Sequence, residues 1–364
     1  MIVVHVLDSV LLGGVGAMAR SLILEQYKAG KQPVLVCPKT EVNGFRKWCN
    51  ENKIRIPFYG IEACRRKYMT IFGGLSSKIE KQITADYPND DIIYHFHNPI
   101  ACGLLFGCKG KSICTIHGFV GKISGRRISN LIVKQTIKNA LKKNVTLVGC
   151  CNAVATYCNN SYHTNRVLTV INGLQAIKVE DHQYIAKNGK CHIGYAATID
   201  ELKGWRILAE AYRRLTQDQR EQCDLYFAGE VSSKDRADFE RFISDNEVHY
   251  LGYIPRTGET FIPFLDVLVL PSRTEGLPMS ILESMQTGVV PIATRVGGIP
   301  ELIENKSSGF LIDRDANELA EILGRLISNR SLLEKVKHES RRRFEEVGTA
   351  TIMEKNYCRI YEQL

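Results

Sequence analysis

The sequence predicts an α/β protein made of two doubly wound domains, and three observations support this fold class. Short apolar runs alternate with amphipathic helical stretches almost from end to end, which is typical of parallel sheets. The 364 residues exceed what one hydrophobic core ordinarily holds. A polar stretch without clear periodicity separates two series of apolar runs. We therefore predict an N-terminal domain at residues 1–175, a linker at 176–190 and a C-terminal domain at 191–348.

The apolar runs predict six strands in each domain. In the N-terminal domain these are residues 2–7, 33–37, 92–97, 112–117, 145–149 and 167–171. In the C-terminal domain they are residues 192–196, 225–228, 248–251, 266–270, 289–293 and 309–312. The last stretch, residues 349–364, has helical spacing of its apolar residues. This helix either caps its own domain or crosses back to the first.

Composition excludes several classes of protein. A hydrophobic content of 44% with 24% charged residues describes a globular protein, and no run of about 18 apolar residues predicts a membrane span. The first residues predict a buried strand and not a signal peptide. The 12 cysteines lack the Cys-x-x-Cys spacing of zinc sites, so we expect free thiols in a reducing cytosol and no metal. The net charge of +9 favours anionic small molecules or lipid surfaces over nucleic acid, since no recognition motif is present.

Two glutamates lie eight positions apart across a predicted strand-to-helix turn. Glu275 falls in the loop after the apolar run 267–270, and Glu283 falls about two turns into the next helix. Open α/β sheets bind ligands at the carboxyl ends of their strands. One carboxylate could therefore reach the near end of a ligand while the other reaches hydroxyls further along.

A glycine-rich segment follows the first predicted strand and opens a helix. Gly13 and Gly14 would let the backbone approach a ligand, and free N–H groups at a helix start attract anions. Gly14, Gly16 and Ala19 also satisfy a loose dinucleotide fingerprint. However, the second strand ends without the acid that would hold a ribose. A purely structural turn is the alternative.

Other candidates follow predicted strands. Lys203 lies between the first strand of the second domain and its helix, where a compact cation suits a leaving diphosphate, or where it is an ordinary solvated lysine. His117 ends a buried strand, a place where a lone histidine is often structural, and His97 is a similar case. Gly297 and Gly298 form a second glycine turn, one strand after the helix that carries Glu283.

Together these motifs resemble those of the retaining GT-B glycosyltransferases of family 4, the glycosyl transferases group 1. The resemblance is closest over residues 271–304. It implies two Rossmann-like domains facing a cleft. It further implies transfer of a hexose or N-acetylhexosamine from a nucleotide diphosphate sugar, with UDP the commoner nucleotide, to a saccharide hydroxyl with retention. No cofactor or metal is expected.

The resemblance also assigns roles to residues. Lys203 would neutralise the leaving diphosphate, Glu275 would hold the sugar hydroxyls, and His117 would orient the sugar. The implied donor-binding residues are Gly13, Gly14, Gly276, Leu277, Pro278, Glu283, Gly297 and Gly298. The chain departs from the family at one point, because the arginine usual five or six positions before the lysine is replaced by Ala197 and Thr198. Arg206 is a candidate substitute.

Residues 126–143 are amphipathic at helical spacing, with lysines stepping by four along one side. Arg126, Arg127 and Lys134 are therefore candidates for contact with an acceptor or an anionic membrane, each basic residue contributing about 1 kcal/mol. The alternative is the solvated face of a core helix. The resemblance implies a lipid-linked acceptor in bacterial surface polysaccharide synthesis, such as O-antigen, capsule or lipopolysaccharide. It places the protein in the cytoplasm, peripheral at the inner face of the membrane.

Three other classes of function stay open. A nucleotide-sugar epimerase or a sugar phosphorylase could use the same two-domain plan. An NAD(P) oxidoreductase would rest on the glycine fingerprint. A non-catalytic glycan- or nucleotide-binding protein would rest on the missing arginine.

Overall fold

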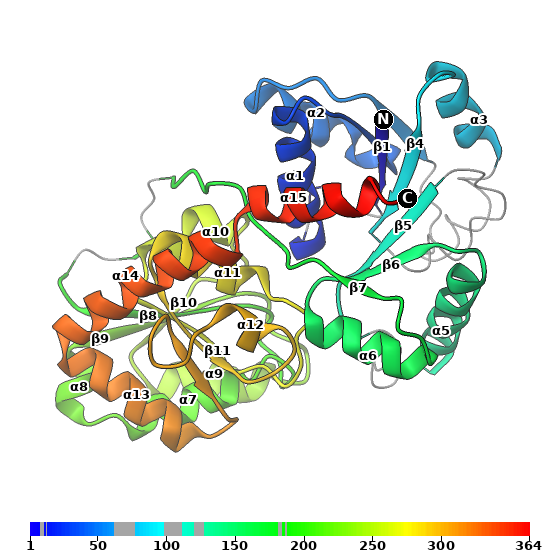
Figure 1. Cartoon of the computed structure of the whole chain (residues 1–364). Coiled ribbons are helices and arrows are strands. Elements are labelled where there is room, and N and C mark those ends of the chain that lie inside the picture. Colours follow the sequence, from blue (N-terminus) through cyan, green and yellow to red (C-terminus); the bar gives the residue numbers. More distant parts are fainter. Residues whose placement is uncertain are drawn as a thin grey trace. The chain divides into compact units, whose positions relative to one another are not determined.

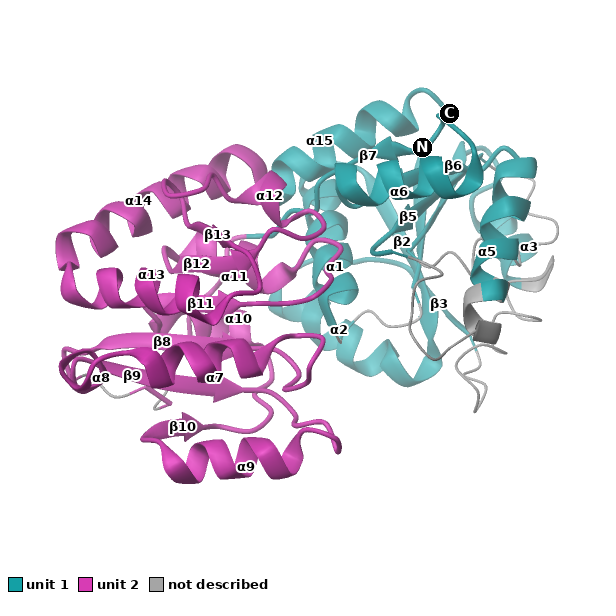
Figure 2. Ribbon diagram, turned by 90° about the horizontal axis from the view of Figure 1, so that it is seen from below, with its two compact units in different colours: residues 1–175, 350–364 teal, residues 176–349 magenta. Residues whose placement is uncertain are grey.

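A computed structural model describes residues 1–7, 11, 13–61, 77–97, 111–119, 127–180, 184–185 and 188–364. The chain divides into two compact units (Figure 2). Unit 1 comprises Met1–Gln175 and Ala350–Leu364, and unit 2 comprises Ala176–Thr349. The C-terminal helix is therefore part of unit 1.

Unit 1 is built on a seven-stranded parallel sheet with the order β3-β2-β1-β4-β5-β6-β7. Its strands are β1 (Ile2–Val6), β2 (Gln32–Pro38), β3 (Phe58–Ile61), β4 (Ile92–Phe96), β5 (Lys111–Ile116), β6 (Thr146–Gly149) and β7 (Leu168–Thr169). The central strands are apolar runs buried on both faces, as a parallel sheet covered by helices requires. In the register of β1 and β4, His5 is paired with His95.

The helical segments of unit 1 are α1 (Gly13–Lys28), η1 (Lys39–Glu41), α2 (Val42–Glu51), α3 (Ser77–Asp86), α5 (Arg127–Lys142), α6 (Asn152–Tyr162) and α15 (Ala350–Tyr361). Helix α15 lies beside α1 (Figure 1). Its residues Met353, Tyr357 and Tyr361 recur at a spacing of four and are almost fully buried. This buried stripe attaches the C-terminal helix to unit 1.

Unit 2 is built on a six-stranded parallel sheet with the order β10-β9-β8-β11-β12-β13. Its strands are β8 (Cys191–Ala196), β9 (Cys223–Ala228), β10 (Val248–Tyr250), β11 (Val267–Leu270), β12 (Val290–Thr294) and β13 (Phe310–Ile312). Its helical segments are α7 (Trp205–Arg214), α8 (Gln217–Glu221), α9 (Arg236–Asp245), α10 (Thr257–Thr260), η2 (Ile262–Phe264), α11 (Met279–Thr287), α12 (Ile299–Leu302), α13 (Ala316–Ser328) and α14 (Arg330–Val347).

The twelve predicted strands are all present, and the predicted fold class is correct. Strand β3 was not predicted. Only Ile61 of its four residues is buried, and Gly60 together with the preceding Pro57 interrupts the apolar pattern. It lies at the edge of the described sheet, where one neighbour is enough and a strong apolar signal is not needed.

The strand order fixes where each unit can bind a ligand. Counted within a unit, both sheets contain the order 3-2-1-4-5-6, in which the direction of the chain reverses between the first and fourth strands. The crevice at that reversal lies between β1 and β4 in unit 1, and between β8 and β11 in unit 2. No helix in the described part of the chain is long and apolar enough to cross a membrane.

Candidate active site

Lys203 and Glu275 meet at the reversal point of the unit 2 sheet. Lys203 lies in the loop between β8 and α7, and Glu275 lies in the loop between β11 and α11; β8 and β11 are neighbouring strands. The Lys203 Nζ is 2.7 Å from Oε1 of Glu275. The Glu275 side chain is 9% exposed and that of Lys203 is 33% exposed. An ion pair thus occupies the place where this fold binds ligands.

Backbone contacts hold these two loops together. The Arg273 N–H donates to the Leu202 carbonyl at 2.7 Å and joins the two loops. Within the first loop, the Lys203 N–H donates to Oδ1 of Asp200 at 2.8 Å. Gly204 has φ of 78°, and a Cβ there would lie 2.1 Å from the Pro271 carbonyl oxygen. Only glycine allows both this conformation and this approach. The spacing of Lys203 and Glu275 is therefore set by the backbone and not by the ion pair alone.

The Gly297–Gly298 turn supports the Glu275 loop from behind. Gly297 has φ of 57°, and a Cβ there would lie 1.8 Å from the Glu275 carbonyl oxygen. The Gly298 N–H donates to the Gly276 carbonyl at 2.7 Å. Because that N–H is already used within the protein, the turn is better suited to positioning the Glu275 loop than to binding a donor through Gly298.

Pro278 precedes α11 and Leu277 is buried beside it, so the chain enters the helix at a fixed point. Glu283 is the fifth residue of α11 and lies in its second turn. The residue is partly buried, and its carboxyl has no hydrogen bond or ion pair to another described residue. Burial raises the pKa of Glu283 to about 7. An unpaired acid with a raised pKa, here in the helix that follows β11, is typical of a functional site.

Arg206 does not face this ion pair. Its guanidinium stacks on the Trp205 ring and pairs with Asp235 at 2.9 Å and Asp238 at 2.8 Å. A different arginine, not predicted from the sequence, reaches the strand ends: Arg314 donates to the Pro271 carbonyl at 2.9 Å. Burial, and then the nearby charge of Arg273, lower the pKa of Arg314.

In unit 1, Gly13 and Gly14 are the first two residues of α1, so the helix starts earlier than the glycine segment suggested. Both are exposed, and Gly13 has φ of 73°. The residues just before them are mostly outside the described part of the chain. The exposed start of this 16-residue helix can attract an anion.

His117 follows β5 directly, and both of its ring nitrogens are buried without a hydrogen-bond partner among the described residues. Its ring stacks with that of His97, with centroids 5.9 Å apart. Burial lowers the pKa of His117 to about 4. The imidazole is therefore neutral at pH 7 and can both donate and accept a hydrogen bond.

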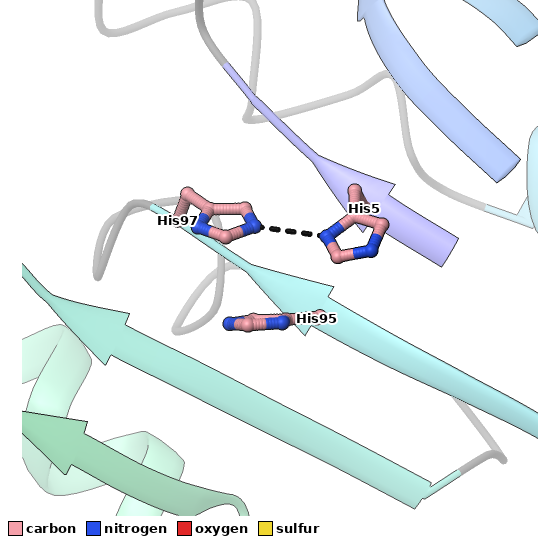
Figure 3. Close-up of side chains that lie close together, drawn as sticks. All are labelled: His5, His95 and His97. Atoms are coloured by element: carbon pink, nitrogen blue, oxygen red, sulfur yellow. Dashed lines mark hydrogen bonds between the residues drawn. The ribbon is translucent and has the colours of Figure 1, made fainter. Parts of the chain in front are cut away.

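Three further histidines, two of them not predicted as candidates, form a buried cluster in the middle of the unit 1 sheet (Figure 3). They are His5 of β1, His95 of β4 and His97 just after β4, each at most 4% exposed. The His5 Nδ1 is 3.0 Å from His97 Nε2, and His5 Nε2 is 2.7 Å from Oε1 of Gln26. Burial lowers the pKa of all three imidazoles, that of His5 to about 4.

This cluster continues to the C-terminal helix. The His95 Nδ1 is 2.7 Å from the Tyr361 hydroxyl, and His95 Nε2 is 2.7 Å from Oγ1 of Thr115. Thr115 Oγ1 is in turn 2.8 Å from the Tyr357 hydroxyl, and Gln26 donates to Tyr361. One hydrogen-bond network thus joins α1, β1, β4, β5 and α15.

The network is better explained by hydrogen bonding than by metal binding. Both nitrogens of His5 and both of His95 already have protein partners. The His95 and His97 rings are stacked 4.1 Å apart at 26°, and ring lone pairs lie in the ring plane. Near-parallel stacked rings do not direct their nitrogens at one ion. The sequence signal for the cluster was the alternation of His95 and His97, which places both on one face of a strand.

The candidate membrane residues are only partly described. Arg126 lies outside the described residues, as does the side chain of Arg127 in the first turn of α5. Lys134 is exposed on α5. Leu131, an apolar residue of the same helix, is 69% exposed.

Comparisons with known proteins agree with this architecture. Residues 190–329 match the family described as glycosyl transferases group 1. An uncharacterized glycosyltransferase of Haemophilus influenzae is 24% identical over 240 residues, which are 64% of each chain. The putative colanic acid biosynthesis glycosyltransferase WcaL of Escherichia coli is 31% identical over 136 residues, 35% of this chain and 34% of WcaL. The chain thus spans just under two thirds of the first relative's length and about a third of the second's.

A solved structure resembles the whole chain. Anabaena Alr3699/HepE, crystallised in complex with UDP-glucose, superposes with a TM-score of 0.77 at 14% identity, covering 100% of both chains. At this identity the likeness concerns the fold.

Proposed function

We propose that the chain is a group 1 glycosyltransferase of the GT-B fold and that it transfers a hexose or N-acetylhexosamine from a nucleotide diphosphate sugar to a saccharide hydroxyl. UDP is the proposed nucleotide, and the anomeric configuration is retained. The observation that carries the proposal is the ion pair of Lys203 and Glu275 at the reversal point of the unit 2 sheet.

The ion pair suggests how the donor binds. An incoming diphosphate competes with Glu275 for the Lys203 ammonium. Once Lys203 turns to the diphosphate, the Glu275 carboxylate is free to accept hydrogen bonds from sugar hydroxyls. As the glycosidic bond to the diphosphate breaks, negative charge grows on the leaving group, and Lys203 stabilises it more than in the ground state. In this proposal the N-terminus of α1 is a second group that favours the anion.

The remaining roles follow from where positive charge develops. The sugar becomes oxocarbenium-like in the transition state, as in glycoside hydrolysis. In this proposal the negative charge of the Glu275 carboxylate stabilises the positive charge on the sugar. In this proposal the neutral His117 orients the sugar, and Glu283 accepts hydrogen bonds from the ribose hydroxyls. Retention then arises by front-face displacement, in which the departing phosphate takes the acceptor's proton. With lysine and helix end neutralising the diphosphate, no metal is required in this scheme.

For the acceptor we propose a lipid-linked saccharide in bacterial surface polysaccharide synthesis, at the cytoplasmic face of the membrane. Support comes from the name of the relative WcaL, which assigns it to colanic acid biosynthesis. Exposed Lys134, Lys138 and Lys142 on α5 form a basic face suited to anionic lipid headgroups.

The decisive test is thermal stabilisation of the purified protein by UDP, GDP, UDP-sugars, GDP-mannose and NADP. A ligand that binds the native state raises the melting temperature by mass action. We expect a shift with UDP and one UDP-sugar that is lost in Glu283→Ala. The matched control is Glu321→Ala, which removes an exposed glutamate from α13 of the same unit.

The other outcomes decide between classes of protein. A shift with NADP alone would replace the transferase by an oxidoreductase. Binding of a UDP-sugar without transfer to any of a panel of saccharide acceptors, and with no release of UDP, would support a non-catalytic binding protein. Conversion of the bound UDP-sugar into its epimer would support an epimerase.

A further inference from the structure

Glu283 faces a glycine on a neighbouring helix. Gly258 is a buried residue of the short helix α10, which packs beside α11. A Cβ at Gly258 would lie 2.6 Å from Cδ of Glu283 and 2.9 Å from its Cγ and Oε1. The space that any side chain at position 258 would need is thus already filled by the Glu283 carboxyl.

The glycine has no backbone reason to be there. The residues with left-handed backbone in this region are Gly252 and Arg256, not Gly258. Glycine inside a helix costs about 1 kcal/mol relative to alanine. Gly258 is unfavourable for its helix and is not needed for a turn. We therefore attribute this glycine to the space that it leaves for the Glu283 carboxyl.

Helix α10 is held in place by contacts with Glu180. The Glu180 N–H donates to the Glu259 carbonyl at 3.1 Å, and Arg256 pairs with the Glu180 carboxylate at 3.0 Å. Arg256 also pairs with the Glu259 carboxylate. These contacts hold α10 and Arg256, the residue before it, in place. The position of the Glu283 carboxyl therefore depends on the side chain at position 258.

We propose that Gly258 is the positioning residue for Glu283: its missing side chain sets how far the carboxyl withdraws from α10 and therefore which ribose hydroxyls it reaches. This inference rests on the proposed function, because it assumes that Glu283 binds the nucleotide ribose. Any side chain at position 258 pushes the carboxyl out of the place in which both ribose hydroxyls are accepted. Gly258 thereby contributes to selectivity for a ribonucleotide over its 2′-deoxy analogue.

The test is calorimetric binding of UDP and of 2′-deoxy-UDP to four proteins: wild type, Gly258→Ala, Glu283→Ala and the double variant. We expect Gly258→Ala to weaken UDP binding about tenfold, the loss of one hydrogen bond to a charged group. The preference for UDP over 2′-deoxy-UDP should fall towards one. The double variant should bind no more weakly than Glu283→Ala alone, because the two changes act through one carboxyl.

The matched control is Gly324→Ala on α13. A Cβ there would also lie 2.6 Å from the end of a flexible side chain, the Nε2 of Gln219. We expect this variant to bind UDP within about twofold of wild type, since changes away from a site and its partners have small effects.

Three results would overturn the inference. These are unchanged UDP binding by Gly258→Ala, equal weakening of both nucleotides, or an effect that adds fully to that of Glu283→Ala. If Gly258→Ala does not fold, the double variant should, because it lacks the clashing carboxyl; failure of both contradicts the proposal. If wild type binds none of the nucleotides, the proposed function falls and this inference falls with it. If Glu283→Ala weakens UDP binding but the effects of Gly258→Ala and Glu283→Ala add in the double variant, this inference alone is overturned.

Discussion

The two units share a strand order but differ in what fills the middle of the sheet. In unit 1, β1 and β4 carry buried histidines that need hydrogen-bond partners from α1, β5 and α15. In unit 2, the equivalent strands β8 and β11 are mainly apolar inside, and the charged groups Lys203 and Glu275 lie beyond the strand ends. Polar groups inside a sheet fix its structure, whereas polar groups past the strand ends can exchange partners with a ligand.

The first prediction tests the exchangeable pair of unit 2. Lys203→Ala and Glu275→Ala should each lower kcat for sugar transfer about 10² to 10³-fold, as is typical when one preorganised charge is removed. Nucleotide affinity should fall in Lys203→Ala but not in Glu275→Ala, which releases the lysine. Steady-state kinetics and calorimetry measure both.

The control for this pair is Glu201→Ala, which breaks the exposed pair with Arg273, and it should change kcat less than twofold. Transfer that survives in Glu275→Ala would show that the role given to this carboxylate is wrong.

The second prediction concerns acid and unit 1. The buried histidines have lowered pKa values when folded and ordinary values near 6.5 when unfolded. Protons therefore bind the unfolded chain first, so stability is full above about pH 6.5 and is lost as the pH falls towards 4. His5 alone should remove on the order of 3 kcal/mol by pH 4.

Urea unfolding between pH 8 and pH 4.5, followed by hydrogen exchange in each unit, measures this loss. Unit 1 should lose protection first. A unit 2 that opens before unit 1 on acidification would contradict the contrast between them.

The third prediction removes one hydroxyl from the unit 1 network. Tyr361→Phe leaves His95 Nδ1 and the Gln26 amide without their partner and should lower the free energy of unfolding by about 1–3 kcal/mol. Tyr253→Phe, which removes a hydroxyl from a tyrosine 62% exposed in unit 2, serves as the control. Equal stability of the two variants would mean that the network does not stabilise unit 1.

The fourth prediction uses the raised pKa of Glu283. The ionised carboxyl accepts hydrogen bonds more strongly than the protonated one, so affinity for a UDP-sugar should fall about tenfold from pH 8 to pH 6 as the acid protonates near pH 7. A UDP-sugar is the suitable probe because its diphosphate does not titrate in this range. Glu283→Gln should flatten the profile, and a profile that keeps its slope in this variant assigns the titration elsewhere.

The fifth and smallest effect concerns the basic face of α5. Replacing Lys134, Lys138 or Lys142 by Gln should weaken binding to vesicles containing anionic lipid by about 1 kcal/mol each. Lys335→Gln, at an exposed position on α14 of unit 2, is the control. Vesicle sedimentation at low and physiological salt measures the change. Loss of equal size in the control would show that the attraction is not specific to α5.

The strands could be predicted because each is a local apolar run, and β3 escaped because its burial is slight. Lys203, Glu275 and Glu283 could be proposed as site residues because strand ends in such sheets carry ligands. Their pairing could not be predicted, since it depends on the order of strands in the sheet, which places β8 beside β11. The partners of Arg206 could not be predicted for the same reason. Asp235 and Asp238 are distant in sequence and become its partners only when α7 and α9 cover the sheet.

The histidine network shows a second limit to what could be predicted from the sequence. His5 and His95 look like exceptions inside apolar runs until the register pairs them. The hydroxyl partner of His95, Tyr361, lies 266 residues later in the chain, and Tyr357 lies 242 residues after its partner Thr115. No local pattern joins residues at such a distance, whereas the apolar spacing of the last helix was visible.

Helix α15 has a consequence for the order in which the protein is built on the ribosome. Unit 2 is inserted in the sequence between two parts of unit 1, so its residues 176–349 are all synthesised before α15 emerges. Until then His95 and Thr115 lack the tyrosine hydroxyls that satisfy them. The unit that starts first is therefore completed only after the whole of unit 2 has been made.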